Sequence, residues 1–90
     1  MEKTIITVVG HDAVGIIAKV CVYLADHGIN ILDISQTIVS GYFNMMMIVD
    51  IAGMEIGFGE LSEDLEALGK EMGLIIKCQK EEIFDMMHRV

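Results

Sequence analysis

The chain has few basic residues and only one arginine. Six Lys and Arg oppose fourteen Asp and Glu, so the formal net charge is −8, and the arginine is Arg89. Nucleic acids and anionic membrane surfaces are held largely by clusters of Lys and Arg. Both would repel a chain of this charge. We therefore expect no binding to nucleic acid and none to a membrane.

Cysteine is also scarce, and long apolar runs are absent. Cys21 and Cys78 lie far apart and form no CxxC pair. Free cysteine is among the most buried residue types, so both are interpreted as core residues of a protein in a reducing compartment. No run of eighteen apolar residues is present, and the N-terminus lacks a charged region followed by an apolar one. These absences predict a cytoplasmic protein.

Apolar residues, by contrast, are abundant, at 53% of 90 residues. This length predicts one domain, residues 1–90, and a domain so short buries only about 60–65% of the surface of its unfolded chain. One small core cannot use that many apolar side chains. The excess indicates a second buried surface, most simply a contact with another copy of the chain. We expect a homo-oligomer, with a dimer as the simplest form.

Hydrophobic periodicity predicts six elements in the order β-α-β-β-α-β. Alternating and continuous apolar runs predict strands, and steps of three and four residues predict helices. A turn at Ser40-Gly41 joins the second and third strands, and Gly28 is suited to a left-handed cap after the first helix. The expected elements are strands at 3–9, 29–40, 42–51 and 74–80, helices at 13–27 and 58–72, and a short amphipathic helix within 81–90.

This order is that of an α+β, ferredoxin-like fold, an antiparallel sheet with two helices on one face. In the third predicted strand every odd position from Phe43 to Ile51 is apolar, so Met45 and Met47 are expected in the core. In the first helix Val14, Ile17, Cys21 and Leu24 form the expected buried stripe. The face that the helices leave uncovered, with residues such as Ile6 or Val8 and Met46, must meet solvent or a neighbour.

The ferredoxin-like fold carries many activities, so function must come from a site. The first loop has neither the paired cysteines of a metal-carrying module nor the cationic cradle of an acyl-phosphate hydrolase. RNA-recognition modules display aromatic residues on their central strands, whereas here the first predicted strand has none and the third has Tyr42 and Phe43 at one end only. His11, His27 and His88 lack the spacing of metal ligands. We expect no enzyme, no catalytic residues, no metal and no cofactor.

The most informative stretch is residues 10–16, which read GHDAVGI. Asp12 is suited to cap the following helix. Gly15 in a first helical turn costs about 0.5–1 kcal/mol relative to Ala, which makes sense if a ligand approaches the backbone there. Free amides at a helix start can bind a carboxylate, and Asp12 could hold an ammonium group. Alternatively, Asp12 is only a cap and Gly15 only relieves packing against a strand. The spacing leaves both interpretations open.

This stretch resembles the signature of the ACT domain family. In that signature an acidic or amide residue, two spacers and a glycine open the first helix, and a Gly-apolar-Asn-Ile segment opens the second strand. The matching residues are Asp12, Gly15, Gly28, Asn30 and Ile31, and Ser35 and Gln36 also fit. The resemblance covers essentially the whole chain. The chain is most similar to stand-alone single-ACT proteins of unassigned function, and more distantly similar to glycine cleavage repressors.

The resemblance implies a regulatory role, because family members bind amino acids at interfaces between paired domains. The ligand-binding positions that it carries over are Asp12, Gly15, the amide of Ile16, and Asn30. Many members have Pro where this chain has Val14, which leaves the helix start less rigid. We therefore expect a small module that binds an amino acid or a similar small ligand at a subunit interface and modulates an unidentified protein partner. The alternative is an interaction module that binds no ligand and acts only through oligomerisation.

Overall fold

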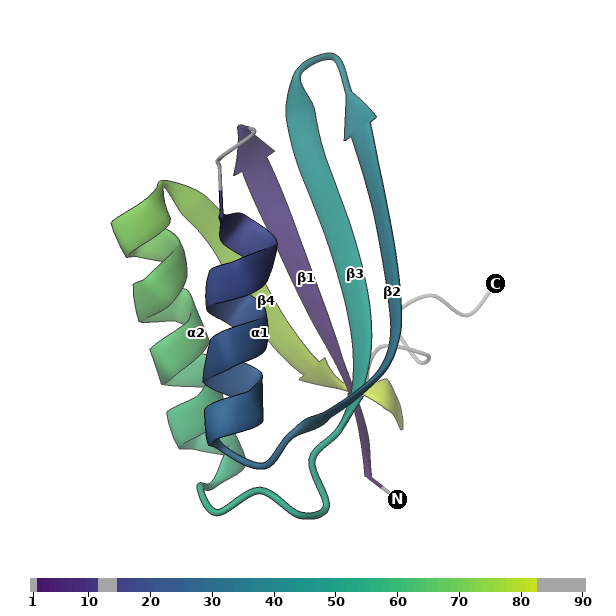
Figure 1. Cartoon of the computed structure of the whole chain (residues 1–90), viewed down its shortest axis with the longest axis vertical. Helices are drawn as coiled ribbons and strands as arrows, with labels where there is room; N and C mark the ends of the chain where they lie inside the picture. Colours follow the sequence, from purple (N-terminus) through teal and green to yellow (C-terminus); the bar gives the residue numbers. More distant parts are fainter. Residues whose placement is uncertain (1, 12–14, 83–90) are drawn as a thin grey trace.

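Four strands and two helices follow one another in a computed structural model that describes residues 2–11 and 15–82. The elements are β1 (Lys3–His11), α1 (Ile16–Asp26), β2 (Asn30–Val39), β3 (Tyr42–Asp50), α2 (Phe58–Met72) and β4 (Leu74–Lys80). The strands form an antiparallel sheet in the order β2-β3-β1-β4, and both helices pack on one face of it (Figure 1). The predicted ferredoxin-like fold is confirmed. The predicted C-terminal helix lies almost wholly outside the described residues.

The turn between β2 and β3 was predicted correctly. Ser40 and Gly41 both have positive φ, 52° and 82°. Positive φ at both central residues is typical of a type I′ turn. The twist of this two-residue turn matches the twist of the two strands that it joins. Val39 therefore faces Tyr42 across the turn, and the register continues down the hairpin.

The first strand is longer than predicted, because Gly10 does not break it. Gly10 lies between Phe43 of β3 and Leu74 of β4 in the sheet, and β1 continues to His11. A Cβ atom at position 10 would lie only 2.4 Å from Cδ2 of Leu74. The glycine therefore admits the Leu74 side chain instead of ending the strand.

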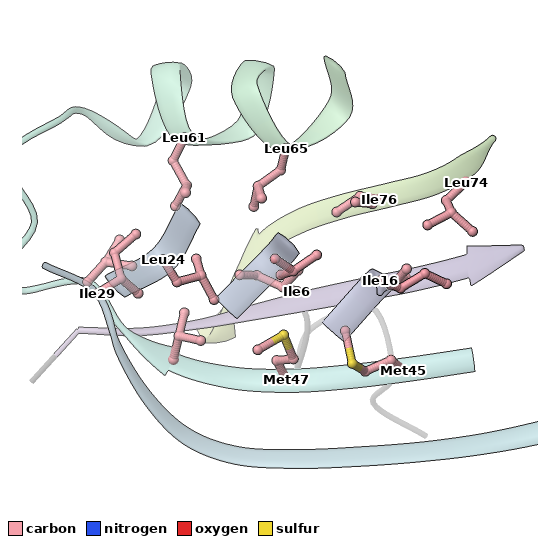
Figure 2. Close-up of a cluster of buried hydrophobic side chains, with 14 of the residues drawn as sticks. Ile6, Ile16, Leu24, Ile29, Met45, Met47, Leu61, Leu65, Leu74 and Ile76 are labelled. Carbon is pink, nitrogen blue, oxygen red and sulfur yellow. The ribbon is translucent and has the colours of Figure 1, made fainter. Parts of the chain in front are cut away.

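The core fills the space between the sheet and the helices (Figure 2). The odd positions of β3 are buried as predicted, including Met45 and Met47. Ile6 and Val8 also belong to this core, so their suggested place on the uncovered face is wrong. Ile6 is paired with Met47, and directly opposed residues lie on the same face of a sheet. Met46 does lie on the open face, where it is exposed.

The buried stripe of α1 differs from the predicted one by about one residue. Ile16, Val20 and Leu24 are buried, whereas Ile17 is 37% exposed. Cys21 is only half-buried. The predicted and the observed stripes both end at Leu24 and are offset by about one residue before it. A helical period of 3.6 residues is compatible with either stripe, so the sequence pattern does not choose between them. The packing against the sheet selects the stripe that begins at Ile16.

Strand β2 is an edge strand that the helices do not cover. No other strand of the described ranges 2–11 and 15–82 pairs with its outer edge. Its helix-side residues Ile34 and Ile38 are exposed, as is Val39 near the turn. Natural edge strands usually carry charges or bulges that discourage pairing. This one has a bulge near Ile31 but keeps an apolar row beyond it. None of the helices within the described residues is long and apolar enough to span a bilayer.

Candidate functional site

Helix α1 begins later than the sequence predicts, and Asp12 is not its cap. The N-cap residue is Gly15, in the left-handed region with φ 81° and ψ 7°, and Ile16 is the first helical residue. Asp12 lies three positions before the cap, and both Asp12 and Val14 are outside the described residues. The prediction of Asp12 as N-cap is therefore wrong.

Gly15 is required by its backbone conformation. A side chain is strained at φ 81° because its Cβ approaches backbone atoms of the same residue and the next. A Cβ atom built there would meet nothing within 4 Å. The glycine therefore does not relieve packing against a strand, which removes that interpretation. It also does not stand inside the helix, so the expected propensity cost does not apply.

Among the residues that the structure describes, no side chain caps the amides of the first turn of α1. The first helical hydrogen bond runs from the amide of Lys19 to the carbonyl of Gly15, at 3.0 Å. Glycine has no side chain to accept from the first-turn amides that follow it, and the first turn holds no acidic residue. Such amides and the positive end of the helix dipole favour an anion. This surface is exposed at Gly15.

The structure does not bring Asn30 to Gly15 within one copy of the chain. Gly28 ends α1 in the left-handed conformation that was predicted, with φ 72°, and the amide of Ile29 donates to the carbonyl of Leu24 at 2.9 Å. Asn30 then opens β2, opposite Asp50. An eleven-residue helix is about 16 Å long, and Gly15 and Asn30 stand at its two ends. Of the four predicted ligand positions, only Gly15 and Ile16 are shown to be neighbours.

An aromatic pair lies at the end of the sheet from which the chain enters α1. The rings of His11 and Tyr42 stack with centroids 4.7 Å apart and planes at 29°. They are opposed in the register of β1 and β3. Sequence reasoning treated His11 only as a metal candidate. The signal that could have found the pair was the register set by the Ser40-Gly41 turn.

At the opposite end, Asp50 is already engaged by the backbone. It accepts hydrogen bonds from the amides of Glu2 and Ala52, both at 3.0 Å. The bond from Glu2 and then that from Ala52 hold the pKa of Asp50 below its ordinary value. Both amides donate to Oδ1, so this carboxylate ties the start of β1 to the end of β3.

In the part of the chain that the structure describes, the histidine and cysteine side chains considered for metal binding or nucleophilic chemistry do not form a cluster. His27 lies 3.3 Å from Glu55 through Nδ1 and Oε1, far from His11 in the fold, and His88 is outside the described residues. Within residues 2–11 and 15–82, no three side chains capable of metal binding come together. Burial raises the pKa of the Cys78 thiol to about 12. A thiol with that pKa is a poor nucleophile at neutral pH.

Comparison with known proteins assigns the chain to a family. The ACT domain model matches residues 2–79. A UPF0237 protein of Bifidobacterium longum is 61% identical over 90 residues, which is the full length of both chains. An ACT domain protein from Streptococcus pneumoniae has a TM-score of 0.81 at 42% identity, and the match covers 93% of this chain and 94% of that one.

A second solved structure extends the likeness to a larger protein. A candidate glycine cleavage system transcriptional repressor has a TM-score of 0.76 at 25% identity, with 88% of this chain and 45% of that chain covered. The resemblance inferred from residues 10–16 and 28–31 is thus confirmed over nearly the whole sequence. The chain belongs to the ACT domain family.

Proposed function

We propose that this protein is a regulatory module that binds a free amino acid at the start of α1. The observation that carries the proposal is the left-handed N-cap at Gly15, which is exposed; within residues 2–11 and 15–82 no side chain caps the first amides of the helix. A carboxylate fits such donors, as at other helix starts. Asp12, three residues before Gly15 in sequence, would hold the ammonium group.

The separation of Gly15 and Asn30 supports a site shared between two copies. If two β2 strands pair antiparallel across a two-fold axis, Asn30 of one copy lies opposite the Val39 end of the other. Val39 is paired with Tyr42, and Tyr42 with His11, so this end of the sheet is the one from which the chain enters α1. Asn30 would thereby approach the helix start of the other copy. The exposed apolar row at Ile34 and Ile38 supports the same pairing.

A regulatory role is more consistent with these side chains than a catalytic one. Three groups that could act as acid, base or nucleophile are poorly placed for that role: His27 lies beside Glu55, Asp50 accepts two backbone amides, and the half-buried Cys78 thiol has a raised pKa. The second candidate function is a ligand-free interaction module. The exposed apolar edge of β2 favours it as much as it favours a ligand-bound dimer.

Thermal-shift measurements with each of the twenty amino acids test the proposal. A ligand at 100 times its Kd adds about 2.7 kcal/mol to the free energy of unfolding, which raises Tm by roughly 10 °C or more in a domain of this size. We expect one amino acid, or a chemically related group, to give such a shift. If none at 10 mM raises Tm while light scattering shows a dimer, the ligand-free interaction module is the better account.

A further inference from the structure

The outer surface of α1 and α2 is hollowed by a groove of about 610 Å³. The two helices lie side by side on the same face of the sheet (Figure 1). Residues one helical turn apart on each helix form the walls, so the groove runs along the helices and spans about two turns of α1. It lies on the opposite side of the helices from the core, away from the β2 edge.

Apolar side chains, two of them small, form the floor of the groove. Ala18 on α1 and Ala67 on α2 both line it, and their small side chains leave room between the helices. Val22 on α1 is 59% exposed, and Leu68 on α2 is half-buried. A branched apolar side chain so exposed on a helix can gain burial from a partner.

The rim of the groove is acidic. Asp26 on α1 and Asp64 and Glu71 on α2 oppose a single cation, Lys19. The hydroxyl of Tyr23 donates to Oδ2 of Asp64 at 2.6 Å, which holds that carboxylate at the rim. Burial, and then this hydrogen bond, raise the pKa of Tyr23 well above its ordinary value, so the hydroxyl remains a neutral donor.

We propose that this groove is the docking surface for a basic amphipathic helix of another protein. Lysine or arginine side chains of that helix would reach Asp26, Asp64 and Glu71, and its apolar side chains would pack on Val22 and Leu68. A third helix lies naturally in the groove between two packed helices. The complementary charge is positive because the rim has three acids and one base, and the chain as a whole has a net charge of −8.

A second copy of this chain does not fit the groove. Two copies would bring the same acidic rims together, and like charges across an interface oppose association. The groove also uses other residues than the predicted amino-acid site. Failure of this proposal would therefore leave the proposed function intact.

The test uses two fluorescein-labelled 14-residue peptides with leucine at helical spacing, one with lysine and one with glutamate at the other positions. Anisotropy is measured with the full chain in 150 mM NaCl. We expect the lysine peptide to bind with a Kd in the micromolar range and the glutamate peptide not to bind. The double variant Asp26→Lys, Glu71→Lys should weaken binding of the lysine peptide at least tenfold. Val22→Ser should weaken it several-fold.

The matched control is Glu63→Lys with Glu82→Lys, which makes the same change in net charge at exposed positions outside the groove. We expect less than a twofold change in Kd. Equal weakening by the two double variants would mean general charge attraction and would overturn the proposal. So would an absence of binding at 1 mM protein, or NMR shift changes that cluster on β2 or the open sheet face.

Discussion

The hydroxyl of Tyr23 on α1 donates to Oδ2 of Asp64 on α2 at 2.6 Å, across 41 positions of sequence. It joins the two helices outside the core, where they have few other polar contacts in the described residues. A partly buried hydrogen bond to a charged acceptor contributes about 1.5–3 kcal/mol at most, and less where water competes.

Tyr23→Phe should lower the free energy of unfolding by about 1 kcal/mol, because it removes this hydrogen bond and keeps the ring. The measurement is urea unfolding of Tyr23→Phe, Asp64→Asn and the double variant. The double variant should be less destabilised than the sum of the single ones. Strict additivity would mean that the two groups do not interact in solution.

Gly15→Ala should destabilise the fold by about 1–2 kcal/mol, because Ala is strained at φ 81°. Gly59→Ala is the matched control. Gly59 stands inside α2 with nothing within 4 Å of an added Cβ, so alanine there should stabilise the fold by up to about 1 kcal/mol. Thermal unfolding of both variants measures the two changes in stability. A Tm of Gly15→Ala equal to or above that of the natural sequence would contradict the left-handed cap.

Ile38→Lys should convert the proposed β2-paired dimer into a monomer, because a charge on an edge strand opposes pairing with a second copy. Ile38 is 64% exposed on β2. Ile75→Lys is the control, since Ile75 is 62% exposed on β4, at the other edge of the sheet. Light scattering should give 9.9 kDa for the first variant and twice that for the second. The reverse result would move the interface away from β2.

Stability should fall in acid in part through Asp50. Its folded pKa is lowered from the value of 3.8 by the amides of Glu2 and Ala52, so its contribution is present above that value. The contribution is lost as the pH falls through the lower, folded pKa. Asp50→Asn should therefore be less stable than the natural sequence at pH 6, with the difference shrinking toward pH 2. Denaturation curves at pH 6, 4 and 2 measure it, and a constant difference would exclude this role.

The Cys78 thiol should make folding sensitive to alkali. Burial raises its pKa from 9.0 to about 12, so the folded state keeps a proton that the unfolded chain releases. Stability due to this group is complete below pH 9 and is lost as the pH rises toward 12. Cys78→Val should flatten the decline of stability between pH 9 and 11. In the natural sequence at pH 8, Cys78 should react with iodoacetamide much more slowly than in urea, followed by mass spectrometry.

Much of the fold follows from local pattern. The bounds of α2 and β4, Phe58–Met72 and Leu74–Lys80, coincide with those predicted, because a strong helical period ends at Gly73 and a strand follows directly. Gly73 has φ 74°, as a glycine after a helix commonly does. The core positions of β3 were also predictable, since alternate residues of a strand face opposite sides.

The candidate site was less predictable. The motif of the ACT family and the helix predicted between them placed Gly15 and Asn30 at opposite ends of α1, but did not predict that Gly15 is itself the left-handed N-cap. Asp12 was assigned as the cap because its side chain suits that role, whereas the observed cap is a glycine with positive φ. Glycine is also among the favoured N-cap residues, so side-chain preference alone did not decide which residue begins the helix.

The sequence by itself determined the order of elements, the hairpin turn, the family and the alternation of β3, because each depends on residues near one another in the chain. Only the tertiary structure decided which face of β1 is buried, where α1 begins, and that Tyr23 meets Asp64. Alternation shows that a strand has two kinds of face, but the helices packed on it decide which one is covered. Ile6 and Val8 are buried because both helices lie on their side of the sheet.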